Sequence, residues 1–131
     1  MTGRHKKWVH WLPVIALCLV IFLQSSFPSP ELGPSFPLKD KLLHMAAYGL
    51  LAILFARACR ETWPGRLYRK QLLFVSIGFA TLYGLGDELH QSLVASRQAE
   101  GWDVVADFAG GAMGAFLYVK WVFARGRTAG R

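Results

Sequence analysis

The feature that most constrains this chain is the length of its apolar segments. Residues 8–27 read WVHWLPVIALCLVIFLQSSF, and further apolar segments occupy residues 41–58, 71–94 and 103–124. A helix needs about 20 mainly apolar residues to cross the hydrocarbon core of a bilayer, and 53% of the residues are hydrophobic. The sequence therefore predicts an all-α protein, in which residues 1–131 form one integral membrane domain built as a four-helix bundle.

The first apolar segment has an alternative interpretation, because a basic head followed by an apolar run is also typical of a secretory signal peptide. Its apolar run is longer than the usual core of a signal peptide, and Pro28 and Pro30 follow it where small residues should mark a cleavage site. We therefore predict a retained membrane helix. At the other end of the chain, the Gly- and Arg-rich residues 125–131 are predicted to be a disordered basic tail.

The basic residues lie almost entirely at alternate ends of the predicted helices. Of the 15 Lys and Arg residues, 12 lie before the first helix, around the loop between the second and the third, or near the end of the fourth. Lys39, Lys41 and Arg97 lie at the opposite ends. The positive-inside rule then predicts a multi-pass protein of a bacterial-type inner (plasma) membrane with both termini in the cytoplasm. Because topology explains the basicity, we expect no nucleic-acid partner, and neither Cys18 nor Cys59 is placed for a disulfide.

Acidic residues are divided in the opposite way, since seven of the eight lie in the predicted extracytoplasmic half. Three predicted helices each carry polar residues on one face at this end. The second helix carries Asp40, His44 and Tyr48. The third carries Thr81, Gly84, Glu88 and Gln91, with Tyr83, Asp87 and His90 beside them. The fourth carries Asp103 and Asp107. Charges inside a membrane face polar partners or a wet cavity. The spacing thus predicts one pocket at the extracytoplasmic ends of the second, third and fourth helices.

The predicted ligand-binding residues of this pocket are Asp40, Lys41, His44, Glu88, Gln91, Arg97, Asp103 and Asp107. Among them, His44 and Glu88 are the candidates for an acid and a base in catalysis. Gly110 and Gly114 form a GxxxG pattern on the face that carries Asp103 and Asp107. Such a pattern lets a neighbouring helix approach closely, so these two glycines are predicted to mark a helix-packing face.

Three segments, DKLLHMAAYGLL, YGLGDELHQSLVASR and WDVVADFAGGAMG, resemble the VanZ-like membrane proteins, a family named for an accessory protein of teicoplanin resistance. The family pattern is Asp-Lys-x-x-His, then Glu-x-x-Gln, a loop Arg, Asp-x-x-x-Asn and Gly-x-x-x-Gly. The resemblance covers about residues 24–117 and implies an extracytoplasmic role connected with cell-envelope antibiotics, without specifying a reaction. One departure is Asp107, where the family often has Asn, because a buried carboxylate needs a proton or a cation.

Two other interpretations of the polar residues compete with a ligand pocket. The first is an internal network of salt bridges that clamps the helix ends, in which acids at helix N-termini are also favoured by the helix dipole. The second is a metal site made by His44, Glu88, Asp103 and Asp107. These four show no regular ligand spacing, and Lys41 and Arg97 are available to neutralise the acids, so the sequence predicts neither a metal nor a cofactor.

Three functions are compatible with a pocket of this composition. The preferred one is a protein that binds or shields an envelope lipid or glycan precursor, with Arg97, Lys41 and His44 engaging its phosphate or carboxylate. The second is a membrane enzyme acting on a lipid-linked substrate, for which no nucleophile motif stands out. The third is a small proton-linked transporter, which is disfavoured because the polar residues do not continue into the cytoplasmic half. The oligomeric state stays open.

Overall fold

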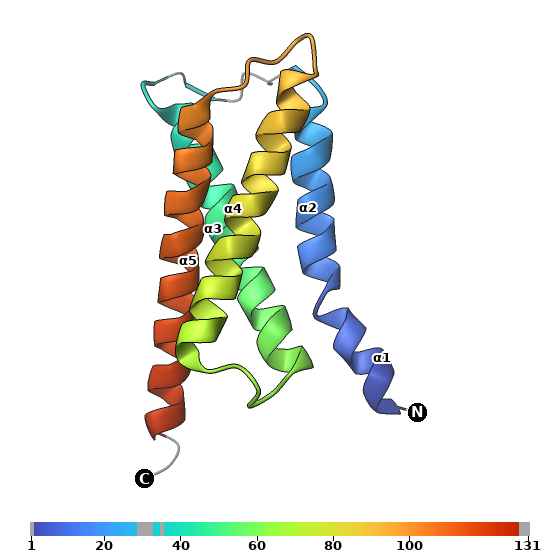
Figure 1. Cartoon of the computed structure of the whole chain (residues 1–131), viewed down its shortest axis with the longest axis vertical. Helices are drawn as coiled ribbons and strands as arrows, with labels where there is room; N and C mark the ends of the chain where they lie inside the picture. Colours follow the sequence, from blue (N-terminus) through green and yellow to red (C-terminus); the bar gives the residue numbers. More distant parts are fainter. Residues whose placement is uncertain (1, 29–32, 35, 129–131) are drawn as a thin grey trace.

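The computed structural model describes residues 2–28, 33–34 and 36–128, and within them the regular structure is entirely helical. The helices are α1 (Thr2–Val9), α2 (Leu12–Ser25), α3 (Lys39–Thr62), α4 (Arg69–Ser92) and α5 (Gly101–Thr128). Figure 1 shows α3, α4 and α5 running along one another, with α2 beside them and α1 leaning away at the N-terminus. The predicted all-α membrane bundle is confirmed.

The first predicted helix, residues 8–27, is broken in the structure. α1 ends at Val9, and the next residues form a turn in which the backbone N–H of Trp11 donates to the carbonyl of Trp8 at 3.0 Å. Pro13 lies in the first turn of α2, where its missing N–H removes no helical hydrogen bond, whereas its ring would clash with the carbonyl of Val9 in a continuous helix. α2 then ends at Ser25 rather than at Phe27.

The remaining helices start two residues earlier than predicted. α3 ends at Thr62 rather than at residue 58, α4 ends at Ser92 rather than at residue 94, and α5 extends beyond residue 124. α5 runs to Thr128, so residues 125–128, which were predicted to belong to a disordered tail, are helical. The guanidinium of Arg125 lies 4.7 Å from the ring centroid of Trp121, one helical turn earlier, and this cation–π contact stabilises the final turns. Residues 129–131 lie outside the described part of the chain.

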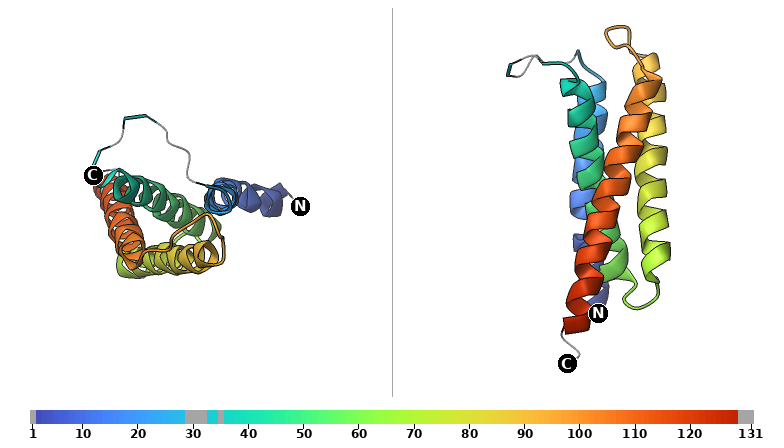
Figure 2. Two further views of the ribbon diagram at one scale, coloured as in Figure 1. Left: turned by 90° about the horizontal axis from the view of Figure 1, so that it is seen from above. Right: turned by 90° about the vertical axis from the view of Figure 1, so that its left-hand side faces the viewer.

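Three segments are long and apolar enough to cross a membrane, namely Lys6–Ser25, Lys39–Thr62 and Arg69–Ser92. α5 has sufficient length at 28 residues, but Asp103, Asp107 and Lys120 lower its mean hydropathy. Figure 2 shows α5 packed alongside α3 and α4 over their length. Asp103 and Asp107 are buried, whereas Lys120 is exposed. Many large apolar side chains are exposed on the outside of the bundle, including Ile15, Phe74 and Phe116, as expected for a surface that meets lipid.

The closest helix contact joins α3 to α5 through glycines. A methyl group added at Gly114 would overlap the backbone of Gly49, and one added at Gly110 would overlap the backbone of Met45. A pair of backbones reaches this separation only where side chains are missing. The contact fixes the start of α5 beside the start of α3, which brings the polar residues of the two helices together.

The half of the bundle that lies away from these polar residues has a mainly apolar interior, in which the hydroxyl of the buried Ser76 donates to the carbonyl of Leu72 in its own helix. Ala56, Cys59, Leu72 and Val119 form a buried cluster there, against which Phe55 and Phe123 pack. Among the described residues, the buried charged side chains Asp87, Glu88, Asp103 and Asp107 lie instead at the end where α3 and α5 begin and α2 and α4 end, which we call the pocket end.

Candidate functional site

An outer layer of charge at the pocket end is organised by Lys41. Its ammonium donates to Glu100 at 2.8 Å and to Asp103, and it lies 3.5 Å from Asp40. We call these four residues the mouth group. Three carboxylates from the start of α3, the loop before α5 and the first turn of α5 thus share one ammonium. Lys41, which the sequence offered as a group for binding a phosphate, is instead occupied by acids of its own chain.

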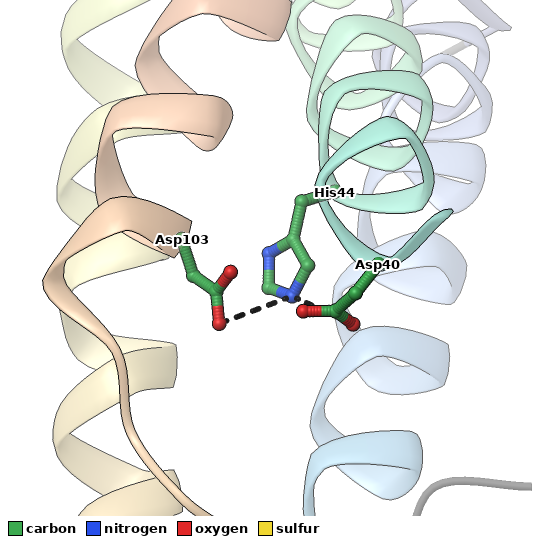
Figure 3. A group of neighbouring side chains, drawn as sticks. All are labelled: Asp40, His44 and Asp103. Carbon is green, nitrogen blue, oxygen red and sulfur yellow. Dashed lines mark ion pairs between the residues drawn. The ribbon is translucent and has the colours of Figure 1, made fainter. Parts of the chain in front are cut away.

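His44 lies between the mouth and a deeper layer. Its Nε2 lies 3.9 Å from Asp40 and 3.9 Å from Asp103, and Figure 3 shows the imidazole directed between these two carboxylates. On the other side of the ring, Nδ1 lies 2.7 Å from Oδ1 of Asp107. A buried carboxylate on one nitrogen fixes the ring orientation and leaves the other nitrogen facing the mouth.

The deeper layer consists of His44, Glu88 and Asp107, which we call the floor group. Oε2 of Glu88 accepts a hydrogen bond from the backbone N–H of Glu100 at 3.0 Å. Oε1 of Glu88 and Oδ2 of Asp107 are buried and have no hydrogen-bond partner among the residues that the structure describes. A methyl group added at Gly84 would lie 2.6 Å from Oδ2 of Asp107, so this glycine makes room for the carboxylate.

Asp87 belongs to a second buried polar cluster, which the sequence-based site did not include. Its Oδ1 accepts a hydrogen bond from Ser25, and its Oδ2 accepts from Tyr48 and Gln91, each at 3.2 Å. The donors come from α2, α3 and α4, so this carboxylate joins three helices. Its position one residue before Glu88 was visible in the sequence, but nothing in the spacing indicated that Ser25 of the first helix would reach it.

Two cavities open among these residues. The larger, the outer cavity, has a volume of about 340 Å³. It is lined by Asp40, His44, Gln91, Ser96, Arg97, Gln98, Glu100 and Asp103. The smaller, of about 50 Å³, extends from Asp40 and His44 past Tyr48 and Asp87 to Ile21 of α2. Five of the eight predicted ligand-binding residues therefore line the outer cavity, while Lys41, Glu88 and Asp107 lie among the contacts around it.

Other residues considered from the sequence lie beside the pocket. The ring of His90 stacks on Phe22 with centroids 4.6 Å apart, and its Nε2 lies 3.5 Å from Ser26, so it packs against α2. The hydroxyl of Tyr83 donates to the carbonyl of Cys18 at 2.5 Å, and Thr81 donates to its own helix. Glu100, by contrast, contributes to both the mouth and the outer cavity, although sequence reasoning had counted it only among the extracytoplasmic acids.

The donor atoms of two sets of side chains are close enough to hold a metal ion. One set is Asp40, His44 and Asp103, and the other is the floor group. Within each set, one donor atom per residue lies within 4.8 Å of the others. The sequence predicted no metal because its candidate ligands show no short repeated spacing. The candidate ligands of the first set come from α3 and α5 and those of the floor group from α3, α4 and α5, so spacing along the chain does not reveal either set.

Comparison with known proteins gives one result. The model of the VanZ/LLP1 family matches residues 10–124, a range that contains all of the mouth group, the floor group and the outer cavity. No curated protein and no solved structure matches the chain.

Proposed function

The chain belongs to the VanZ/LLP1 family, and from this membership and the geometry of the pocket we propose that it binds, and thereby shields, an envelope lipid or a lipid-linked glycan precursor. The link to teicoplanin resistance that the family name implies is part of this proposal. The observation that carries it is a polar cavity of about 340 Å³ at the end of an apolar bundle.

The surroundings of the cavity suit an amphipathic ligand. Leu42 and Leu43 of α3, Leu89 of α4 and Trp102 of α5 are exposed apolar side chains near the same end of the bundle. A ligand with its polar head in the cavity would keep its hydrocarbon chain in the bilayer beside these residues. Each part of such a ligand then lies in surroundings of its own polarity, which favours a membrane-resident ligand over a soluble one.

The charges of the cavity suggest which polar groups are recognised. Asp40, Glu100 and Asp103 line it as acceptors, and Lys41 is already bound to all three. Gln91 and Gln98 add amide groups. Carboxylates and amides accept hydrogen bonds from hydroxyl and ammonium groups, so sugar hydroxyls or amines match these acceptors. The guanidinium of Arg97, in the same lining, matches the phosphate or carboxylate that the sequence suggested.

We place the pocket on the extracytoplasmic face because 12 of the 15 Lys and Arg residues belong to the opposite side of the predicted topology. Alkaline phosphatase fused after Arg131 should therefore be inactive, whereas the same enzyme inserted between Ala95 and Ser96 should be active. An active C-terminal fusion on an intact protein would show that the pocket faces the cytoplasm.

Blocking the cavity tests the proposed binding in cells. Ser96→Trp places a large side chain at a position that is exposed and lines the cavity, while the matched control Ala95→Trp changes an exposed neighbour outside the lining. In a strain whose teicoplanin tolerance rises on expression of this protein, we expect Ser96→Trp to remove the increase and Ala95→Trp to keep it. Equal tolerance in both variants at equal protein levels would refute a role for the cavity.

A membrane enzyme is a second candidate, favoured by the contact of 2.7 Å between His44 and Asp107. A histidine oriented by a buried carboxylate and facing a cavity is the arrangement of a general base. Turnover of a lipid-linked glycan by the wild type, lost in His44→Gln, would support it, and binding without any product would exclude it. A transport path receives no such support, because apolar side chains form the described core of the other half of the bundle and the buried hydroxyl of Ser76 there is bonded within its own helix.

A further inference from the structure

The floor group contains two buried acids whose charge is poorly matched by their contacts. Glu88 and Asp107 are 7% and 0% exposed. The ion pairs of Lys41 go to the mouth group, whereas the floor acids receive a backbone N–H from Glu100 and one imidazole nitrogen from His44. An ionised carboxylate in such a place is costly unless a cation is near.

Each of these acids also has one oxygen that makes no hydrogen bond with any of the described residues. These are Oε1 of Glu88 and Oδ2 of Asp107. Buried oxygens without partners are rare in folded proteins, and a bound ion is one of the recognised explanations for them. Two of them in one cluster, beside a histidine, form a donor set that is incomplete without a further group.

From these contacts we propose that the floor group binds one divalent transition-metal ion of the Zn²⁺ class through His44 Nδ1, Glu88 and Asp107. An imidazole nitrogen with two carboxylates suits Zn²⁺ or Mn²⁺ better than Ca²⁺ or Mg²⁺, which prefer oxygen ligands. Two ionised carboxylates balance the charge of a divalent ion, and the histidine is neutral, so the occupied site has no net charge. This inference concerns the floor of the same pocket but does not depend on the identity of the ligand in the outer cavity.

The geometry requires small movements only. Donor atoms of the three residues lie within 4.8 Å of one another, and His44 Nδ1 is 2.7 Å from Asp107 Oδ1. Around tetrahedral Zn²⁺ at about 2.0–2.1 Å, neighbouring ligand atoms lie about 3.3 Å apart. The contact of 2.7 Å between His44 and Asp107 would open by about 0.6 Å through rotation of side-chain ends. Nε2 would then carry the proton and face Asp40 and Asp103, as carboxylates orient a metal-bound histidine.

The mouth set of Asp40, His44 and Asp103 is the competing position. There Lys41 contacts both carboxylates, so an ion would have to approach an ammonium that already neutralises them. Asp40 is also largely exposed, which weakens its hold on a ligand. The charge balance therefore favours the floor.

The test uses the full chain, purified in mild detergent, stripped with a chelator and titrated with Zn²⁺ alone by calorimetry. We expect one Zn²⁺ per chain, and at least about a 100-fold loss of affinity in Glu88→Gln and in Asp107→Asn. The comparison variant Asp40→Asn, which changes the mouth and one of the two carboxylates that face Nε2 of His44, should lose about tenfold in affinity at most, well short of the loss in the floor variants. Gel filtration and circular dichroism would show that each variant is folded, and two floor variants are used so that one poorly folded protein does not decide the result.

Two outcomes would overturn the proposal. If the folded wild type binds no stoichiometric Zn²⁺, the floor acids carry protons instead. If Asp40→Asn removes binding while both floor variants keep it, the ion belongs to the mouth. Because no lipid is present in the titration, a failure here leaves the proposed envelope ligand untouched, and loss of lipid binding in Ser96→Trp would leave the metal result unchanged.

Discussion

Lys41→Met should unfold at a temperature roughly 10 °C or more below that of the wild type, because it removes the cation that neutralises a buried acid. The side chain of Asp103 is 4% exposed, so water solvates its carboxylate poorly. Its negative charge therefore depends on the ammonium of Lys41 for compensation. Breaking a buried pair by removing one partner costs about 3–5 kcal/mol. Methionine keeps most of the length of the lysine side chain, so the loss of stability would come from the missing charge rather than from lost packing.

A second substitution separates the buried acid from the exposed one. In the Lys41→Met background, Asp103→Asn removes the uncompensated charge and should restore most of the stability. Asp40→Asn in the same background should restore little, since the side chain of Asp40 is 63% exposed and water already solvates it. Thermal unfolding in detergent would measure all four proteins. If Asp103→Asn fails to rescue Lys41→Met, the pair does not stabilise the pocket end.

Asp87→Leu is the second substitution from which we expect a large effect. It removes the acceptor for Ser25, Tyr48 and Gln91. The buried hydroxyls of Ser25 and Tyr48 then have no acceptor, whereas Gln91 keeps its hydrogen bond to Ser25 at 3.3 Å. At about 1–3 kcal/mol for each unsatisfied group, the total loss should be roughly 3 kcal/mol or more. Tyr48→Phe removes one of the same hydrogen bonds and should cost about 1 kcal/mol.

The loss should be local, because Asp87 is one of few polar links between α2 and the rest of the bundle. Among the others are the hydrogen bond from Trp11 to Thr62 at 2.8 Å and that from Tyr83 to Cys18 at 2.5 Å. Hydrogen exchange of backbone amides should therefore accelerate in α2 of Asp87→Leu while α5 changes little. Equal acceleration in α2 and α5 would mean that Asp87 supports the whole bundle and not the attachment of α2.

The sequence predicted the helices well because their signals are local. Apolar length and charge at the helix ends are properties of neighbouring residues, and helical spacing correctly placed His44 and Asp107 on faces that meet. The break at the start of α2 was missed although Pro13 was visible, since a single proline near a helix start is compatible with either a kink or a new helix.

The pairing of the charges could not be predicted in the same way. Lys41 and Asp103 are separated by 62 positions, as are Ser25 and Asp87, and no local pattern says which acid a lysine will choose. The sequence therefore included five of the eight residues that line the outer cavity, missed Ser96, Gln98 and Glu100, and assigned Lys41 to a ligand. The contact of Gly114 with Gly49 decides the register of α5 on α3, and this register decides which charges meet.

Binding of an envelope lipid in the outer cavity is tested most directly by native mass spectrometry of the protein extracted from bacterial membranes in mild detergent. We expect the wild type and Ala95→Trp to carry one lipid-linked glycan precursor or glycolipid per chain, identified by its mass after release, and Ser96→Trp to carry none. A wild type that carries only bulk phospholipid, at the level found on Ser96→Trp, would contradict the proposed function.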